Sequence, residues 1–378
     1  MLKKSINILL ISPVVFLSLF IPRNKNKFSF GDWFGKKNSD SSFYIFKEAA
    51  KDNRFKVAWI TKSDKIYKDL INQNYICYKA NSFKGILHQL SSFTFVSTVN
   101  SFDFYPPALF GKKNYIQLGH GMPFKQYFKK KLTKFQKFRF YLRSKTIENY
   151  SYYASNSEVF NNIAKFQYNV DDSKILEIPP ARFDFFFNTS KIDILRELEL
   201  DENKVYIVYL PTHRNEGKSI DVIIDNLKLL DNILVELKLE YKVLFKPHFY
   251  DINKFKNHDF NYEKIMFNPH WNSDELMLVS DLFIGDYSGV IFDYFNLNKF
   301  EIGLCTDYKN YVINHRDLYF NLDDIYQNLA MNGQDLKMLL SKFENNCLKK
   351  TDSKFVWQNN SKLSLSEIAW KKIFKTVI

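Results

Sequence analysis

The chain has 378 residues, of which 46% are hydrophobic and 17% aromatic, and its formal net charge is +13. This length suits two α/β domains, and the apolar content excludes a largely disordered protein. The basic charge predicts an anionic partner, which could be nucleic acid, an acidic membrane surface, a nucleotide or a phosphate-bearing polymer. Three widely spaced cysteines, Cys77, Cys305 and Cys347, indicate neither a zinc site nor a disulfide framework, so we expect a reducing, cytoplasmic environment.

The first predicted element is an apolar segment from Ile6 to Pro22, with basic residues on both sides. It is short for a spanning helix and contains Pro13, and no small-residue cleavage site follows it as a signal peptide would require. We interpret residues 1–27 as a membrane-proximal segment at the cytoplasmic face of the membrane. The alternative is a buried first strand and helix of the N-terminal domain.

From Lys56 onward, short apolar runs alternate with amphipathic ones, which is typical of βα units and parallel sheets. The first half has five predicted strands, at residues 57–61, 93–99, 115–118, 152–154 and 175–178. A polar, helical stretch at 183–200 separates them from five more, at residues 205–210, 241–245, 265–267, 282–284 and 301–304. We therefore predict an α/β fold with an N-terminal Rossmann-like domain at 28–185 and a C-terminal one at 186–360.

The last predicted element is a helix at 361–378, in which Ser364 and Glu367 have the spacing of a capping box. Its apolar face contains Ile368, Trp370 and Ile373, so it has to dock against a domain, and we expect the N-terminal one.

Polar residues follow four of the predicted strands, at 119–125, 211–214, 246–248 and 286–289. Ligands of open parallel sheets bind beyond the carboxyl ends of the strands, so we expect two histidines, an arginine, two lysines and a helix start to line a cleft. This set suits a pyrophosphate. Ser288 could also be only the cap of the helix that follows it. The sequence contains no Walker P-loop, GxGxxG, HExxH or GxSxG motif, and no metal site or cofactor is predicted.

A basic, aromatic stretch at residues 129–145 could bind anionic lipid or a phosphate polymer, or it could be a solvated helix whose aromatic side chains face the core. Nucleic acid is not expected as its partner, because no recognised nucleic-acid-binding fold surrounds it.

These motifs resemble, in chain order, those of the CDP-glycerol glycerophosphotransferases that build teichoic acids and related capsule polymers. Residues 115–125, YIQLGHGMPFK, are similar to the family's NLWHGTPLK, and residues 285–302, GDYSGVIFDYFNLNKFEI, to TDYSSVMFDYALLKKPII. Three shorter motifs also match: IPPARFD at 178–184 is similar to GYPRND, YLPTHR at 209–214 to YAPTWR, and LFKPHFY at 244–250 to KxHP.

The resemblance implies a GT-B fold and transfer of a polyol phosphate, most simply glycerol phosphate, from a CDP-polyol to a lipid-linked or saccharide hydroxyl, with release of CMP. His120 would be the general base, and His248 would stabilise or protonate the pyrophosphate. The predicted donor-binding residues are Thr212, Arg214, Lys246, Ser288, Gly289, Asp293 and Arg182, and those that position the acceptor are Gly121 and Lys125.

The chain departs from the family's motifs at three positions: Gly289 replaces a serine, Phe249 a proline and Met122 a threonine. These departures leave the polyol and the acceptor open. One alternative is a sialyltransferase-like GT-B enzyme that uses a CMP-sugar. A non-enzymatic alternative is a basic peripheral membrane protein that binds an anionic polymer.

Overall fold

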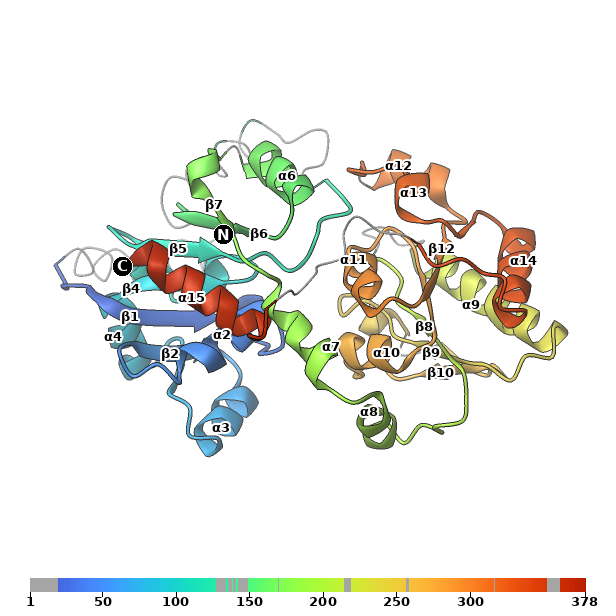
Figure 1. Ribbon diagram of the computed structural model, residues 1–378, viewed down its shortest axis with the longest axis horizontal. Helices are drawn as coiled ribbons and strands as arrows, with labels where there is room; N and C mark the ends of the chain where they lie inside the picture. Colours follow the sequence, from blue (N-terminus) through green and yellow to red (C-terminus); the bar gives the residue numbers. More distant parts are fainter. Residues whose placement is uncertain are drawn as a thin grey trace, which may run out of the picture. The chain divides into compact units, whose positions relative to one another are not determined.

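The computed structural model describes residues 20–126, 134, 138, 141, 149–168, 170–213, 219–255, 258–315, 317–351 and 361–378. The chain forms two compact units (Figure 1). The first contains residues 1–120, 132–184 and 357–378, and the second contains residues 121–131 and 185–356. The segment that begins at Gly121, which the sequence analysis assigns to the N-terminal domain, belongs to the second unit.

The first unit is built on a seven-stranded parallel sheet with the order β3-β2-β1-β4-β5-β6-β7. Its strands are β1 Asn24–Gly31, β2 Lys56–Thr61, β3 Cys77–Lys79, β4 Ser92–Ser97, β5 Asn114–Gln117, β6 Tyr152–Ser155 and β7 Ile175–Glu177. Helices α2 Ser41–Ala49, α3 Asp64–Asn72, α4 Phe83–Ser91, α6 Glu158–Tyr168 and α15 Leu365–Val377 belong to the same unit, with the short helices η1 Trp33–Gly35, η2 Ser101–Asp103, η3 Pro106–Leu109, η4 Asp172–Lys174 and η5 Ala181–Phe183. The central strand β1 has register partners on both sides, Phe28 opposite Val57 of β2 and Thr94 of β4.

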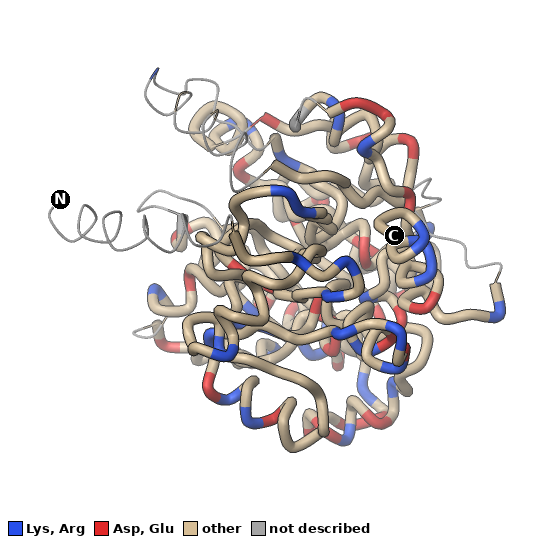
Figure 2. Tube along the Cα trace, turned by 90° about the vertical axis from the view of Figure 1, so that its left-hand side faces the viewer, with Lys and Arg blue, Asp and Glu red and all other residues tan. Residues whose placement is uncertain are grey.

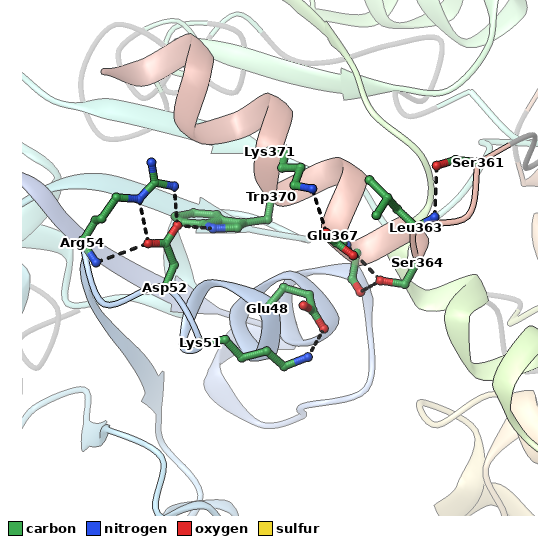
Figure 3. A network of polar contacts seen from close by, with 11 residues as sticks. Glu48, Lys51, Asp52, Arg54, Ser361, Leu363, Ser364, Glu367, Trp370 and Lys371 are labelled. Atoms are coloured by element: carbon green, nitrogen blue, oxygen red, sulfur yellow. Dashed lines mark hydrogen bonds and ion pairs between the residues drawn. The ribbon is translucent and has the colours of Figure 1, made fainter.

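The C-terminal helix α15 packs against α2 in the first unit (Figure 1). The Trp370 ring makes edge contacts with Phe28 and Phe55, each at a centroid distance of 5.2 Å, and its indole N–H donates to Asp52 at 3.3 Å (Figure 3). Ser364 caps the helix by accepting a hydrogen bond from the Glu367 backbone N–H at 3.2 Å. Because Trp370 is almost fully buried, replacing it with alanine would cost about 3–5 kcal/mol of stability. Helix α15 is therefore part of the first unit's core.

The second unit is built on a six-stranded parallel sheet with the order β10-β9-β8-β11-β12-β13. Its strands are β8 Tyr206–Tyr209, β9 Lys242–Phe245, β10 Ile265–Phe267, β11 Leu282–Gly285, β12 Phe300–Leu304 and β13 Leu329–Ala330. Its helices are α8 Lys191–Glu197, α9 Ser219–Glu236, α10 Ser273–Val279, α11 Val290–Tyr294, α12 Tyr308–Asn314, α13 Leu322–Ile325 and α14 Gly333–Glu344, with η6 Ile252–Phe255 and η7 Phe295–Leu297; α7 Asp184–Asn188 begins at the boundary of the two units. Buried aliphatic and aromatic side chains of β8, β9 and β11 form the core with α9 and α14.

Both sheets have the strand order of a Rossmann fold, in which the chain starts at a central strand, builds one side, and returns to build the other. The strand order therefore reverses between β1 and β4 in the first unit, and between β8 and β11 in the second. Ligands of such sheets bind beyond the carboxyl ends of the strands at this point. The predicted class, α/β with two Rossmann-like parallel sheets, is confirmed.

All ten predicted strands are present, with ends shifted by at most two residues. Three strands were not predicted: β1, β3 and β13. Strand β1 begins at Asn24, inside the stretch that the sequence analysis assigns to a membrane-proximal segment, and it becomes the centre of the first sheet.

The parts of the chain for which membrane contact was predicted lie largely outside the described residues, namely residues 1–19 and all of 129–145 except Lys134, Phe138 and Tyr141. Within the described ranges, no helix combines the length and the apolar character needed to cross a membrane. Lys and Arg are spread along the described trace and are interspersed with Asp and Glu (Figure 2).

Candidate functional site

In the first unit, a tight turn follows the central strand β1. Trp33, Phe34 and Gly35 all have positive φ, 42°, 62° and 74°. Asp32, just before them, is fully buried and accepts hydrogen bonds from the backbone N–H groups of Ser39 and Asp40 at 3.2 and 3.0 Å. Residues other than glycine pay a conformational cost in this left-handed region, and such strain is concentrated at functional sites.

His120 follows β5, and its exposed side chain lies beside this turn. Its ring centroid is 5.5 Å from that of Trp33, in an edge-to-face arrangement. The Trp33 indole N–H donates to Asp40 Oδ2 at 3.0 Å, and Asp40 Oδ1 forms a buried ion pair with Arg182 Nη1 at 3.0 Å. Burial by itself would raise the pKa of Asp40, but the charge of Arg182, the Ser41 N–H and the proximity of His120 lower it overall.

In the second unit, a backbone-to-carboxylate contact spans the point where the strand order reverses. The Thr212 N–H, after β8, donates to both carboxylate oxygens of Asp286, after β11, at 2.9 and 3.1 Å. Thr212 and Asp286 are both buried, and the Asp286 carbonyl accepts a hydrogen bond from the Tyr326 hydroxyl at 2.6 Å. The loops that carry Thr212 and Ser288 are therefore tied together at the position where Rossmann-like sheets bind their ligands.

The turn from Asp286 to Gly289 leads into α11, a helix of only five residues. Ser288 is half-buried, and its Oγ accepts the Val290 N–H at 3.5 Å, a long contact that leaves the hydroxyl largely uncommitted to capping. Gly289 is the N-cap residue of α11. Asp293 is buried within the helix.

The segment that begins at Gly121 is anchored in the second unit. The Phe124 ring packs against Phe292 at a centroid distance of 5.7 Å, and the Phe124 carbonyl accepts the Tyr319 N–H at 3.0 Å. The Met122 carbonyl is so close to Gly289 that a β-carbon at position 289 would lie 2.5 Å from its oxygen. This segment brings the charge of Lys125 close to His248, as the effect of Lys125 on the pKa of His248 shows.

His248 lies after β9 with Lys246, on the same sheet edge as Thr212 and Ser288. Burial, together with the positive charges of Lys125, His213 and Lys246, lowers the pKa of His248 to about 3, although Asp251 acts in the opposite direction. In the free protein at neutral pH, His248 is therefore a neutral imidazole that can donate one hydrogen bond.

The model of the family CDP-Glycerol:Poly(glycerophosphate) glycerophosphotransferase matches residues 14–356. The chain belongs to this family. It is 30% identical over 219 residues to a teichoic acid poly(ribitol-phosphate) polymerase of Bacillus spizizenii. This alignment covers 56% of this chain and 35% of that protein. It is 28% identical over 311 residues to a teichoic acid poly(glycerol phosphate) polymerase of Staphylococcus epidermidis. This second alignment covers 75% of this chain and 42% of that protein. The chain thus spans less than half the length of these two relatives.

Among solved structures, this glycerophosphotransferase-family chain is similar to variants of the wall teichoic acid polymerase TagF. One superposes with a TM-score of 0.78 at 23% identity, and a CDPG-soaked crystal with 0.76 at 23%; each alignment covers 100% of this chain and 95% of the other. At this identity the likeness shows the fold alone, which is GT-B-like with two Rossmann-like domains.

The glycerophosphotransferase-family site residues predicted from the sequence fall into two groups. His120 and Arg182 belong to the first unit, where the Arg182 guanidinium is engaged by Asp40. The larger group belongs to the second unit: Gly121, Lys125, Thr212, Lys246, His248, Ser288, Gly289 and Asp293. Arg214 lies outside the described residues.

Four residues beside the predicted ones were missed by sequence reasoning: Trp33 and Asp40 next to His120, and His213 and Asp251 next to His248. The positive φ of Trp33 has no signature in the sequence, but a buried Asp directly before a helix start, as at Asp40, is a detectable signal. Within the described ranges, no group of three or more His, Cys, Asp or Glu side chains is arranged to hold a metal ion.

Proposed function

We propose that this chain transfers a polyol phosphate, most simply glycerol phosphate, from a CDP-activated donor to a hydroxyl of a lipid-linked or saccharide acceptor during synthesis of teichoic acid or a related surface polymer. Family membership supports this, as do the names of the relatives and the CDPG soaked into TagF. The observation that carries the proposal is the second unit's sheet edge, where the loops after β8 and β11, with Thr212 and Ser288, are tied together at the strand-order reversal, and the loop after the neighbouring strand β9 carries His248.

In the proposed reaction, the donor pyrophosphate binds at this edge. Lys246 and Arg214 supply positive charge, and Ser288 and the backbone N–H groups after it supply hydrogen bonds. Lys125, which the family resemblance assigns to the acceptor, adds its charge beside His248. His248 donates an N–H to a phosphate oxygen. It contributes no positive charge in the free protein, because burial holds the pKa of its imidazole near 3. A bound pyrophosphate would raise that pKa and strengthen the contact.

His120 is the proposed general base. It takes the proton of the acceptor hydroxyl as that oxygen forms a bond to the β-phosphorus, and the bond from the β-phosphorus to the bridging oxygen breaks to release CMP. Asp40, whose carboxylate is ionised by its ion pair with Arg182, would favour the imidazolium that results. Trp33 limits the positions that the His120 ring can take.

Contact with an anionic membrane at the cytoplasmic face is also part of the proposal. Phe83 and Leu87 on α4 are exposed at 78% and 45%, and Phe20 at 68%. A pocket of about 330 Å³ beside them is lined by Ile21 and Leu87 together with Lys27 and Lys84. Exposed apolar side chains flanked by lysines suit the interface of an anionic bilayer.

The test is the reaction itself. Purified protein with CDP-glycerol or CDP-ribitol and a lipid-linked saccharide should release CMP, and the acceptor should gain the mass of a polyol phosphate. His120→Ala should lower the rate at least about 100-fold, since general-base catalysis is typically worth that much. His270→Ala removes an exposed histidine far along the chain and should leave the rate unchanged.

Three results of these assays would contradict part of the proposal. Gain of a sugar mass from a CMP-sugar would identify a glycosyltransferase instead. Salt-sensitive polymer binding with no turnover of any donor would favour the non-enzymatic alternative. Full activity of the His120→Ala variant would exclude His120 as the base.

A further inference from the structure

His213 stands where the family motif has tryptophan, and in this chain it is paired with a buried carboxylate. His213 Nδ1 and Asp251 Oδ2 are 2.8 Å apart. The His213 side chain is 24% exposed and that of Asp251 only 3%. The second carboxylate oxygen of Asp251 forms an ion pair with Lys254 Nζ at 2.7 Å. The buried Asp251 carboxylate therefore has a basic partner at each of its two oxygens. One of these partners is the His213 imidazole at the sheet edge.

Asp251 also holds the turn that carries His248. Its backbone N–H donates to the His248 carbonyl at 2.7 Å, and its own carbonyl accepts the Lys254 N–H at 2.8 Å. The rings of His213 and His248 are 5.4 Å apart and inclined by 30°, and Tyr250 lies against both, at 5.4 and 5.3 Å. One residue thus positions both histidines, His213 through its carboxylate and His248 through its backbone.

The two imidazoles have different surroundings. His248 faces the positive charges of Lys125 and Lys246, and burial keeps it neutral. His213 has the Asp251 carboxylate at one ring nitrogen, which leaves Nε2 for another partner. An imidazole between a carboxylate and a bound phosphate carries a proton on each nitrogen, because both neighbours stabilise the charged form. A tryptophan at this position could not supply that charge.

We infer that His213 is a further phosphate-binding residue of this site, with Nδ1–H donated to Asp251 and Nε2–H to a phosphate oxygen, and that Asp251 is the residue that positions it. The inference rests on the proposed function for the identity of the donor, but it does not depend on CDP-glycerol, because inorganic pyrophosphate presents the same oxygens. The ionisable groups in contact with the His213 ring are Asp251, His248 and Tyr250. Lys254 pairs with Asp251, and the charges of Lys125 and Lys246 act on the neighbouring His248.

The experiment measures binding of inorganic pyrophosphate, and separately of CDP-glycerol, to the full chain by calorimetry at pH 7.5 in two buffers of different ionisation enthalpy. Wild-type protein should take up protons on binding. His213→Asn and Asp251→Asn should each weaken binding about tenfold or more, as expected for loss of a charged hydrogen bond, and reduce the proton uptake. The double variant should be no weaker than the weaker single variant, because the two residues act as one unit.

Asp259→Asn is the matched control, since it removes the same charge from an exposed position eight residues further on. In ¹⁵N-histidine spectra, the His213 signals should move to the doubly protonated form when pyrophosphate is added, and Asp251→Asn should prevent this. If Asp251→Asn fails to fold, His213→Asn alone still decides the matter, because His213 is not in the core.

Wild-type affinity or undiminished proton uptake in His213→Asn would overturn the inference and assign the uptake to His248. Failure of the proposed function has a different signature: no CMP release from CDP-glycerol by the wild type, with pyrophosphate binding still dependent on His213. Undiminished turnover of CDP-glycerol by His213→Asn would leave the proposed function intact and remove His213 from it.

Discussion

Gly289 is the residue at which a departure from the family's motif has a structural explanation. Its φ of −62° is open to any amino acid, so conformational freedom is not the reason for glycine here. The reason is space, because a β-carbon would lie 2.5 Å from the Met122 carbonyl oxygen. The serine of the family's motif could be accommodated only if the segment after His120 moved away.

We therefore predict that Gly289→Ala lowers the stability of the second unit by about 1–3 kcal/mol, the usual cost of overpacking a close backbone contact. Urea unfolding measures it. Gly333→Ala is the control: its β-carbon would meet only the end of the Leu229 side chain, at 2.9 Å, which can rotate away. Equal losses in the two variants would contradict the steric explanation.

Residue types alone indicate candidate site residues, but they do not indicate which of these residues contact one another. His248 and Lys246 were found because polar residues after a buried strand are conspicuous in the sequence. The sequence patterns assign no role to His213 or to Asp251. Their pairing depends on a turn that folds Asp251 back toward the end of β8, across 38 positions of the chain.

At the scale of elements, helix α4 has a buried face and two exposed apolar side chains one turn apart. His88 and Leu90 face the core, while Phe83 and Leu87, one turn apart, are exposed. Ser82 caps the helix, accepting the Gly85 N–H at 3.1 Å, so its start does not depend on membrane contact.

Replacing both Phe83 and Leu87 with glutamate should weaken binding to anionic phospholipid vesicles about tenfold or more, because it removes apolar contact and adds repulsive charge. Vesicle co-sedimentation measures this. Ile313→Glu alters a residue that is 81% exposed in the second unit and should not change binding. Equal effects of the two changes would indicate non-specific repulsion instead of a membrane-binding edge.

Strands could be predicted wherever they are short apolar runs, and β1 shows where this fails. Its first half, Asn24–Lys27, is polar and exposed, and only Phe28–Gly31 is buried. Its position at the centre of the sheet comes from pairing with β2 and β4, which are 25 or more residues away in the sequence. Local composition does not contain that information.

At the scale of the whole molecule, buried ionisable groups make stability depend on pH in opposing ways. Burial lowers the pKa of His88 to about 4 and that of His248 to about 3. Both groups therefore increase the free energy of unfolding as pH rises toward 6.5, where their neutral forms also prevail in the unfolded chain. Burial raises the pKa of Asp103 and of Glu301 to about 7, so these groups stabilise the protein most below about pH 4 and lose that effect as pH rises through 7.

Glu301→Gln isolates one of these effects. Wild-type Glu301 stays protonated in the folded state up to about pH 7 but ionises near pH 4.5 when unfolded. Its contribution to the free energy of unfolding therefore falls as pH rises between these values. The variant lacks this titration. Its free energy of unfolding, relative to that of the wild type, should therefore rise by about 3 kcal/mol between pH 4.5 and pH 8. Thermal or urea unfolding at the two pH values measures it. Glu263→Gln, an exposed position, should show no such gain.

The sequence by itself determined the α/β class, the two parallel sheets, ten of the strands and the positions of most candidate site residues. These follow from local patterns, because a buried strand and the polar turn after it are adjacent in the chain. The tertiary structure decided what depends on distant pairs: the central place of β1, the anchoring of the segment after His120 in the second unit, the space that requires glycine at 289, and the Asp251 carboxylate at His213. The physical reason is that each of these is a contact between residues that no local pattern connects, made only when the sheet order brings their loops together.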